Sequence, residues 1–223
     1  MEFRHELKHE ISYVEMLSLR ARLKAVMDVD PHAINGEYFI RSLYFDNIYD
    51  KALREKIDGV NNREKFRIRY YNRNTERILL EKKSKLHGLC NKKQTIISQE
   101  CAEAIAGSDI EKLKAIDDPL VFELYQKMRT EGLRPKVIVD YDREPYIYVP
   151  GNVRVTIDKN IRTGLKNTDY LKSDSITIPV VDSPIILEVK WDEYLPSIIR
   201  DIVQIPSTHT SAFSKYAACR MYD

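Results

Sequence analysis

Basic side chains occupy every second position along segment 62–72, and this alternation restricts the fold more than any other feature. One parity holds Arg63, Lys65, Arg67, Arg69 and Tyr71, and the other holds Glu64, Phe66, Ile68 and Tyr70. A period of two is typical of a β-strand, whose successive side chains point to opposite faces. One face of this strand therefore carries four positive charges, while the opposite face is mainly apolar.

The strands expected on either side repeat the pattern. Segment 77–85 places Glu81, Lys83 and Lys85 in register, and a turn containing Gly88 leads to a strand at 91–97 with Lys92 and Lys93. At the start of the chain, segment 3–11 places Arg4, Glu6 and Lys8 on one parity. Successive strands can thus present cations to one side of a sheet.

The remaining elements follow from similar signals. Further strands are expected at 38–46, 136–143, 152–158, 175–181 and 185–191, which are rich in Val, Ile and Tyr. Helices are expected from the Ser12/Glu15 capping box to Asp30-Pro31, at 52–56, 98–106 and 119–131, after Pro196, and around Ser214–Tyr216. The capping residues and prolines mark where these helices begin and end.

Strands with one charged and one apolar parity do not suit an ordinary sandwich, which hides an apolar inner face. We expect an α+β fold in which a closed eight-stranded antiparallel barrel is wrapped outside by helices and holds the charged parity in its lumen. The competing interpretation is an exposed sheet with one solvated face. With 223 residues, 43% of them hydrophobic, residues 1–223 are expected to form a single domain that buries roughly 70% of its unfolded surface.

The charge distribution indicates an anionic ligand. Residues 63–93 hold eleven Lys and Arg against three acids, so the rest of the chain carries −6 within a net charge of +2. Unit charges about 4 Å apart at an effective dielectric near ~20 repel by about 4 kcal/mol. A triphosphate or polyphosphate would offset this repulsion and accept bidentate bonds from guanidinium groups. Glu6, Glu81, Asp158 and Glu188 could pair with the cations or hold a divalent metal.

Composition argues against several other classes of protein. Stacking aromatics in the style of RNA-binding sheets are missing and the net charge is small, so we do not expect a nucleic-acid partner. The first ten residues lack a signal peptide's apolar segment, and no apolar run approaches the ~20 residues that span a bilayer. Cys90, Cys101 and Cys219 are widely spaced and odd in number, which favours free thiols and a cytoplasmic location.

Seven motifs, in order along the chain, resemble the polyphosphate polymerase (VTC) domain family. They are RHELK at 4–8, SLYFD at 42–46, KFRIRYY at 65–71, LLEKKSK at 79–85, RVTIDKNIR at 154–162, LEVKW at 187–191 and FSKY at 213–216. The family is a branch of the triphosphate tunnel metalloenzymes, or CYTH-like proteins. The resemblance implies an eight-stranded tunnel in which the γ-phosphoryl of ATP is added to a growing polyphosphate chain. It also implies a divalent metal, Mn²⁺ or Mg²⁺.

The same resemblance implies roles for individual residues. The implied catalytic group is Arg67, Arg69, Lys83, Arg154 and Glu188, and further phosphate ligands would be Lys8, Arg143, Arg162, Lys190, Ser214 and Lys215. A lysine of the fifth strand would be Lys92 or Lys93, with Lys93 preferred. Glu188 is the implied metal ligand. Glu6, Glu81 and Asp158 are secondary candidates for metal ligands. The first strand offers Arg4-x-Glu6-x-Lys8 where the superfamily has ExExK, which argues against a second metal held by that strand.

Alternatives remain open for these roles. The acids could form structural ion pairs, such as Glu81 with Lys83 or Asp158 with Arg154. The same fold could also be a hydrolase in which water replaces the phosphate chain and a tripolyphosphate or nucleoside triphosphate is cleaved. A polyphosphate-binding module without catalysis is the third possibility, although it would have little need of the Glu188 carboxylate.

Overall fold

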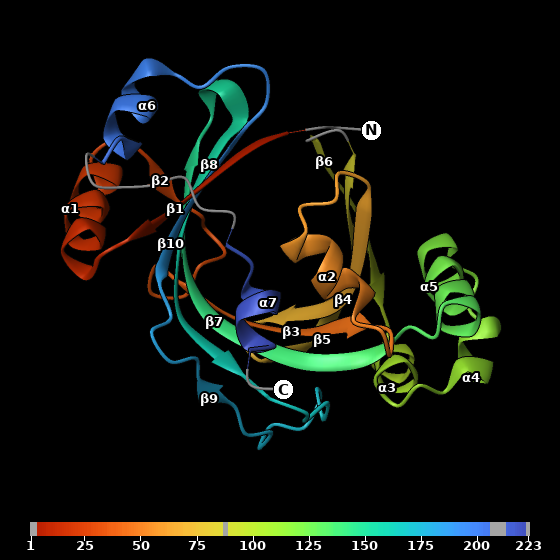
Figure 1. Ribbon diagram of the computed structural model, residues 1–223. Coiled ribbons are helices and arrows are strands. Elements are labelled where there is room, and N and C mark those ends of the chain that lie inside the picture. The colour runs from red at the N-terminus through yellow and green to blue at the C-terminus, as the bar shows by residue number, and fades with distance from the viewer. Residues whose placement is uncertain (1–3, 87–88, 206–212, 222–223) are drawn as a thin grey trace.

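Eight antiparallel strands form one strongly curled sheet in the computed structural model, which describes residues 4–86, 89–205 and 213–221 (Figure 1). In spatial order they are β1 (His5–Ile11), β10 (Ile185–Trp191), β8 (Val153–Thr163), β7 (Arg134–Tyr148), β3 (Tyr38–Asp46), β4 (Arg63–Tyr71), β5 (Asn74–Leu86) and β6 (Leu89–Ile97). Two short strands extend it: β2 (Asp28–Val29) pairs with β7, and β9 (Ile178–Pro179) pairs with β8. The α+β prediction and the antiparallel arrangement are confirmed.

The prediction of a closed barrel is wrong. Within the described ranges, the continuous ladder ends at β1 and at β6, and these two edges meet only through an isolated bridge between Arg4 and Cys90. Closure requires the stagger of all the strands to agree around the ring. Alternation along each strand predicts which side chains share a face, but it contains no information on this stagger. The sheet is therefore curled and open along one seam.

Helices on the convex face cover the apolar parity in two groups. α1 (Tyr13–Lys24) and α6 (Ser197–Val203) cover β8 and β10, while α3 (Gln99–Ala106), α4 (Ile110–Lys114) and α5 (Pro119–Thr130) cover β4 and β5. The Ser12/Glu15 capping box is present at the start of α1, and the Asp118 carboxylate accepts hydrogen bonds from the first turn of α5. These helices confirm the expected external layer.

Two helices lie on the concave face instead, so the prediction that all helices pack outside is wrong for them. α7 (Lys215–Cys219) lies inside the curve of the sheet next to α2 (Lys51–Ile57) (Figure 1). The Tyr216 ring stacks on Tyr44 with centroids 5.3 Å apart, and the Tyr216 hydroxyl donates to Asp46 at 2.6 Å. Small residues at the end of α7 allow it to approach β7 and β8 closely. One part of the concave face is thus filled by apolar packing.

A β-bulge changes the alternation of β8. Asp142 pairs with Lys159 but Asp140 pairs with Arg162, so β8 has one extra residue, and Asn160 takes a φ of 54°. A bulge of this kind moves the side chains beyond it to the opposite face. As a result Ile161 packs on the concave side, in the cluster with α7.

Strand and helix lengths differ from expectation in a few places. β7 and β8 are longer than the expected 136–143 and 152–158, and a short 3-10 helix, η1 (Pro150–Asn152), connects them. Segment 175–181, expected to be a full strand, contributes only β9.

Candidate functional site

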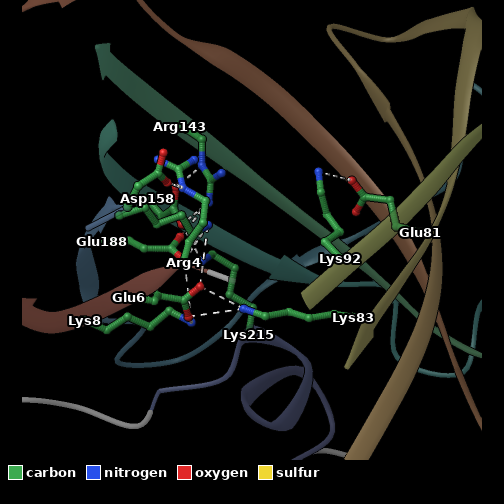
Figure 2. Close-up of polar contacts among 12 residues, drawn as sticks. Arg4, Glu6, Lys8, Glu81, Lys83, Lys92, Arg143, Asp158, Glu188 and Lys215 are labelled. Atoms are coloured by element: carbon green, nitrogen blue, oxygen red, sulfur yellow. Dashed lines mark hydrogen bonds and ion pairs between the residues drawn. The ribbon is translucent and has the colours of Figure 1, made fainter. Parts of the chain in front are cut away.

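Charged side chains from seven strands and one helix meet on the concave face. Figure 2 shows part of this group, around Glu6, Asp158 and Glu188. We define the luminal cluster as Glu6 and Lys8 (β1), Lys65, Arg67 and Arg69 (β4), Glu81 and Lys83 (β5), Lys92 (β6), Arg143 (β7), Asp158 (β8), Glu188 and Lys190 (β10) and Lys215 (α7). Lys8 pairs in register with Glu188, and Arg67 with Glu81. Residues directly opposite in an antiparallel ladder share a face, which is why these charges meet.

Glu188 is the buried acid of β10. Its carboxylate lies 2.9 Å from Lys190 Nζ, 3.2 Å from Arg143 Nη2 and 3.8 Å from Lys8 Nζ, and the side chain is 6% exposed. Burial alone would raise the pKa of Glu188, but the charges of Lys190 and Lys8 outweigh it and hold the pKa well below its ordinary value. Glu188 is therefore ionised and surrounded by cations.

Glu6 connects β1 to the opposite side of the lumen. Its carboxylate accepts from Lys83 at 2.9 Å and lies 2.9 Å from Lys8 Nζ. Burial and the nearby Glu188 charge favour the neutral acid, but the surrounding lysines lower the pKa of Glu6 to about 2. Burial opposes the charge of Lys8 as well, yet Glu188 and Glu6 raise the pKa of that lysine above its ordinary value.

Asp158 is fully buried and holds two cations. Arg143 donates to it through Nε at 2.6 Å and Nη2 at 2.8 Å, and Lys215 Nζ approaches to 2.5 Å. Burial would raise the pKa of Asp158, but Arg143 and Lys215 lower it to about 2. The alternative pair of Asp158 with Arg154 is absent, because Arg154 reaches Asp30 at 3.3 Å.

Glu81 neutralises part of the charge on β4. Its carboxylate lies 2.5 Å from Arg67 Nε, 3.9 Å from Arg69 Nη1 and 3.4 Å from Lys92 Nζ. These cations outweigh burial and lower the pKa of Glu81. The alternative pair of Glu81 with Lys83 is not formed, since Lys83 binds Glu6. Figure 2 shows the Glu81 and Lys92 pair apart from the group around Glu188.

Charge in the luminal cluster does not balance. Its nine basic side chains face four carboxylates, so when all are ionised an excess of five positive charges remains among these residues. The guanidinium of Arg69 illustrates the shortage: it is 3% exposed, donates to Ser42 Oγ and the Tyr141 hydroxyl at 2.9 Å each, and shares its carboxylate contact, Glu81 at 3.9 Å, with Arg67 and Lys92. An arrangement of this kind is complementary to a polyanion.

Several residues named from the sequence lie away from this cluster. Lys93 pairs in register with Lys82, which lies over Phe66 on the convex face, so Lys92 is the luminal lysine of β6. Arg162 lies beyond the β8 bulge and donates to Thr177.

Two further residues lie at the edge of the site. Arg154 is directly opposite Lys190 in the ladder, but its side chain is 39% exposed. Ser214 is the N-cap of α7, and its hydroxyl accepts a hydrogen bond from the backbone N–H of Ala217.

Tyr44 and Tyr141 also lie in the lumen, but neither is among the site residues predicted from the sequence. The Tyr44 hydroxyl accepts from Arg67 Nη1 at 2.8 Å, and the Tyr141 ring lies 4.6 Å from Lys215 Nζ. Burial would raise the pKa of Tyr44, but Arg67, Lys65 and Arg69 lower it to about 7. Both tyrosines share the parity of polar residues on their own strands, and that shared parity was the available signal.

Glu188 and its neighbouring carboxylates could supply one or two of the ligands of a divalent cation, but not a complete set. In residues 4–86, 89–205 and 213–221, no group of three or more His, Cys, Asp and Glu side chains is arranged to hold a metal. The Glu188 charge nevertheless acts on both Glu6 and Asp158, opposing their ionisation. Mg²⁺ and similar ions commonly use one or two carboxylates together with phosphate oxygens of the substrate. Glu188 with Glu6 or Asp158 fits that donor set.

Comparisons with known proteins agree with this architecture. The profile of the VTC domain matches residues 3–222. A candidate adenylate cyclase from Bacillus halodurans has a similar structure, with a TM-score of 0.52, 14% identity and coverage of 92% of this chain and 94% of that chain. At this identity the likeness shows a common fold.

A candidate adenylate cyclase from Vibrio parahaemolyticus gives a TM-score of 0.48 at 9% identity, covering 90% of this chain and 82% of that one. The PH1819 protein of Pyrococcus horikoshii OT3 gives 0.45 at 13%, covering 89% and 84%. A search of curated proteins found no significant match. None of the helices in the described part of the chain is long and apolar enough to cross a membrane.

Proposed function

Since this chain belongs to the VTC domain family, we propose that it is a metal-dependent phosphotransferase that moves the γ-phosphoryl of ATP onto a polyphosphate chain. The observation that carries the proposal is the luminal cluster, where Arg67 and Arg69 share one concave face with Glu188 and cations exceed acids. A slender polyanion with nearly one charge per phosphate matches such a surface.

Arg67 and Arg69 are the proposed clamp on the transferred phosphoryl group, with Arg154 at the edge of the site. Phosphoryl transfer proceeds through a loose transition state, and positioned cations provide most of its stabilisation. Glu81 now occupies part of the hydrogen-bonding capacity of Arg67 at 2.5 Å. A phosphate oxygen would share or replace that contact, so Glu81 keeps the guanidinium in place when no substrate is bound.

The acceptor chain is proposed to lie along Lys8, Lys83 and Lys215. Each of these lysines is held by a carboxylate, Lys8 and Lys83 by Glu6 and Lys215 by Asp158, which fixes the ammonium groups in the lumen. The terminal phosphate oxygen of the acceptor is largely ionised near neutral pH. No side-chain base is then needed to activate it.

A divalent cation, Mn²⁺ or Mg²⁺, is proposed to be held by Glu188, with Glu6 or Asp158 as a second ligand. It would neutralise charge on the phosphate oxygens. Lys190 and Arg143 contact the Glu188 carboxylate and would orient it toward the lumen. Glu81 is a weaker candidate ligand, because it binds Arg67 on the other side of the site.

The test is to incubate the purified protein with ATP and Mn²⁺ or Mg²⁺, with and without a short polyphosphate primer, and to measure ADP, free phosphate and polyphosphate together. ADP matched by polyphosphate supports the proposal. ADP matched by free phosphate contradicts it and indicates that the protein is a triphosphatase. If neither ADP nor polyphosphate forms but polyphosphate binds in a salt-dependent way, the protein is a binding module without catalysis.

A further inference from the structure

Lys65 differs from the other cations of the luminal cluster in having no carboxylate partner among the residues that the structure describes. It lies on β4 two residues before Arg67 and is directly opposite Lys83 in the ladder. Lys83 is held by Glu6 at 2.9 Å, and Arg67 by Glu81 at 2.5 Å. The ammonium of Lys65 instead lies over the Tyr44 ring, with Nζ 5.4 Å from the ring centroid.

The charged groups facing Lys65 are mostly cationic. Arg67, Lys83 and Lys8 all oppose its positive charge, and Tyr44 is the group that favours it. Burial is the largest influence and, with these cations, lowers the pKa of Lys65 to about 7.

Three acids lie near the stem of Lys65, and two of them bind other groups. Asp46, Glu55 and Glu64 line the same small cavity as Lys65, between α2 and β4. Asp46 accepts from the first turn of α2, and Glu64 binds Lys82 and Lys127. Burial raises the pKa of Glu55. Asp46 and Glu64 thus already bind other groups, and none of the three acids forms an ion pair with Lys65 in the part of the chain that the structure describes.

We propose that Lys65 is a phosphate-binding residue of the lumen, together with Arg67 and Arg69 on the same strand. A phosphate oxygen of the bound triphosphate or polyphosphate would supply the anionic partner that its ammonium lacks. This inference rests on the proposed function, because it requires a phosphate chain in the lumen. Desolvated ammonium groups change protonation readily when an anion arrives. Binding of phosphate would therefore be coupled to uptake of a proton by Lys65.

The experiment is calorimetry of inorganic tripolyphosphate binding, without divalent metal, in two buffers of different ionisation enthalpy near neutral pH. For the native protein we expect Lys65 to add an uptake of about half a proton per site, because a group with a pKa near 7 is about half protonated there. Lys65→Arg should bind tripolyphosphate but lose that uptake, since arginine stays charged. Because the native protein and Lys65→Arg bind the same ligand, the change in protonation of tripolyphosphate itself cancels when the two are compared.

Three more variants isolate the contribution of the Lys65 charge. Lys65→Met retains much of the apolar stem and should weaken binding about tenfold, whereas Lys112→Met, at a lysine 74% exposed on α4, should bind as the native protein does. Tyr44→Phe should keep the uptake. The proposal is overturned if Lys65→Arg takes up as many protons as the native protein, if Lys65→Met binds normally, or if the uptake disappears in Tyr44→Phe.

The outcome is separate from that of the proposed function. Release of free phosphate from ATP without polyphosphate synthesis would contradict the proposed function. The inference about Lys65 would still hold if tripolyphosphate binding were coupled to proton uptake by Lys65. Polyphosphate synthesis with an unchanged KM for ATP in Lys65→Met would contradict only the inference about Lys65.

Discussion

The Glu6 carboxylate on β1 accepts a hydrogen bond of 2.9 Å from Lys83 on β5, which joins one edge strand of the ladder to the strand next to its other edge. The edges β1 and β6 share only the bridge between Arg4 and Cys90 in the described part of the sheet. Side-chain ion pairs across the lumen therefore complement sparse backbone pairing along the seam. The same side chains form the candidate phosphate site, so binding and the closeness of the two edges are physically connected.

Replacing Glu6 by Gln should reduce the dependence of stability on acid pH. The folded-state pKa of about 2 lies below the ordinary 4.5, so the ionised carboxylate contributes stability that is fully present above about 4.5. That contribution, on the order of 3 kcal/mol, is lost as pH falls toward 2. Urea unfolding from neutral pH down to about pH 2 should show a steeper loss for the native protein than for Glu6→Gln.

Glu193→Gln is the matched control for this measurement, because Glu193 is exposed. Its unfolding free energy should follow that of the native protein at every pH. Parallel curves for the native protein and Glu6→Gln would show that the Glu6 ion pairs contribute nothing to folding.

Replacing Glu188 by Gln should lower kcat by about 10²–10³-fold, because the variant loses the carboxylate proposed to hold the divalent cation. Tripolyphosphate binding without metal should persist, since removing a negative charge leaves the excess of cations larger. ADP formation across a series of Mn²⁺ concentrations measures the effect, with Glu193→Gln as the control. Unchanged turnover in Glu188→Gln would exclude the metal assignment.

Replacing Arg69 by Lys should lower kcat/KM by about 10²-fold while the protein remains folded. The planar guanidinium donates at once to Ser42 and Tyr141, and a lysine cannot reproduce that orientation and still clamp a phosphate. Arg77→Lys, at an exposed position of β5, should behave as the native enzyme. Equal kcat/KM for Arg69→Lys would mean that its charge alone matters.

Much of this site could be predicted from local patterns, because direct cross-strand neighbours share a face. Arg67, Arg69 and Glu188 follow from alternation and motif together, and the structure places all three in the lumen. Arg162 does not follow, since the extra residue in β8 at Asn160 reverses the parity, and a bulge has no simple signature in the sequence. Lys92 and Lys93 are adjacent, so motif spacing alone could not choose between them.

The open seam and the position of α7 depend on long-range geometry. α7 spans only Lys215–Cys219, too short for a helical pattern that indicates which face of the sheet it covers. Its contacts with Asp46 and Tyr44 join segments about 170 residues apart in the chain. Stagger between β1 and β6 likewise depends on the whole sheet. Such features become visible only when all the strands are assembled.

A buried ion pair outside the lumen provides a test that separates stability from catalysis. Arg41 donates to Asp140 through Nε at 2.9 Å and Nη2 at 2.8 Å, and the two side chains are 8% and 2% exposed. Arg41 also donates to the carbonyls of Lys172 and Ser175, which fixes the segment before β9.

Asp140→Leu leaves a buried guanidinium without its acid and should cost about 3–5 kcal/mol of unfolding free energy. Replacing both residues by Leu should recover part of that loss, because no buried charge remains. At a temperature where each variant is folded, kcat/KM for ATP should match the native value, since neither residue faces the lumen. A large fall in kcat/KM without loss of stability would instead mean that this pair supports the luminal face of β3 and β7.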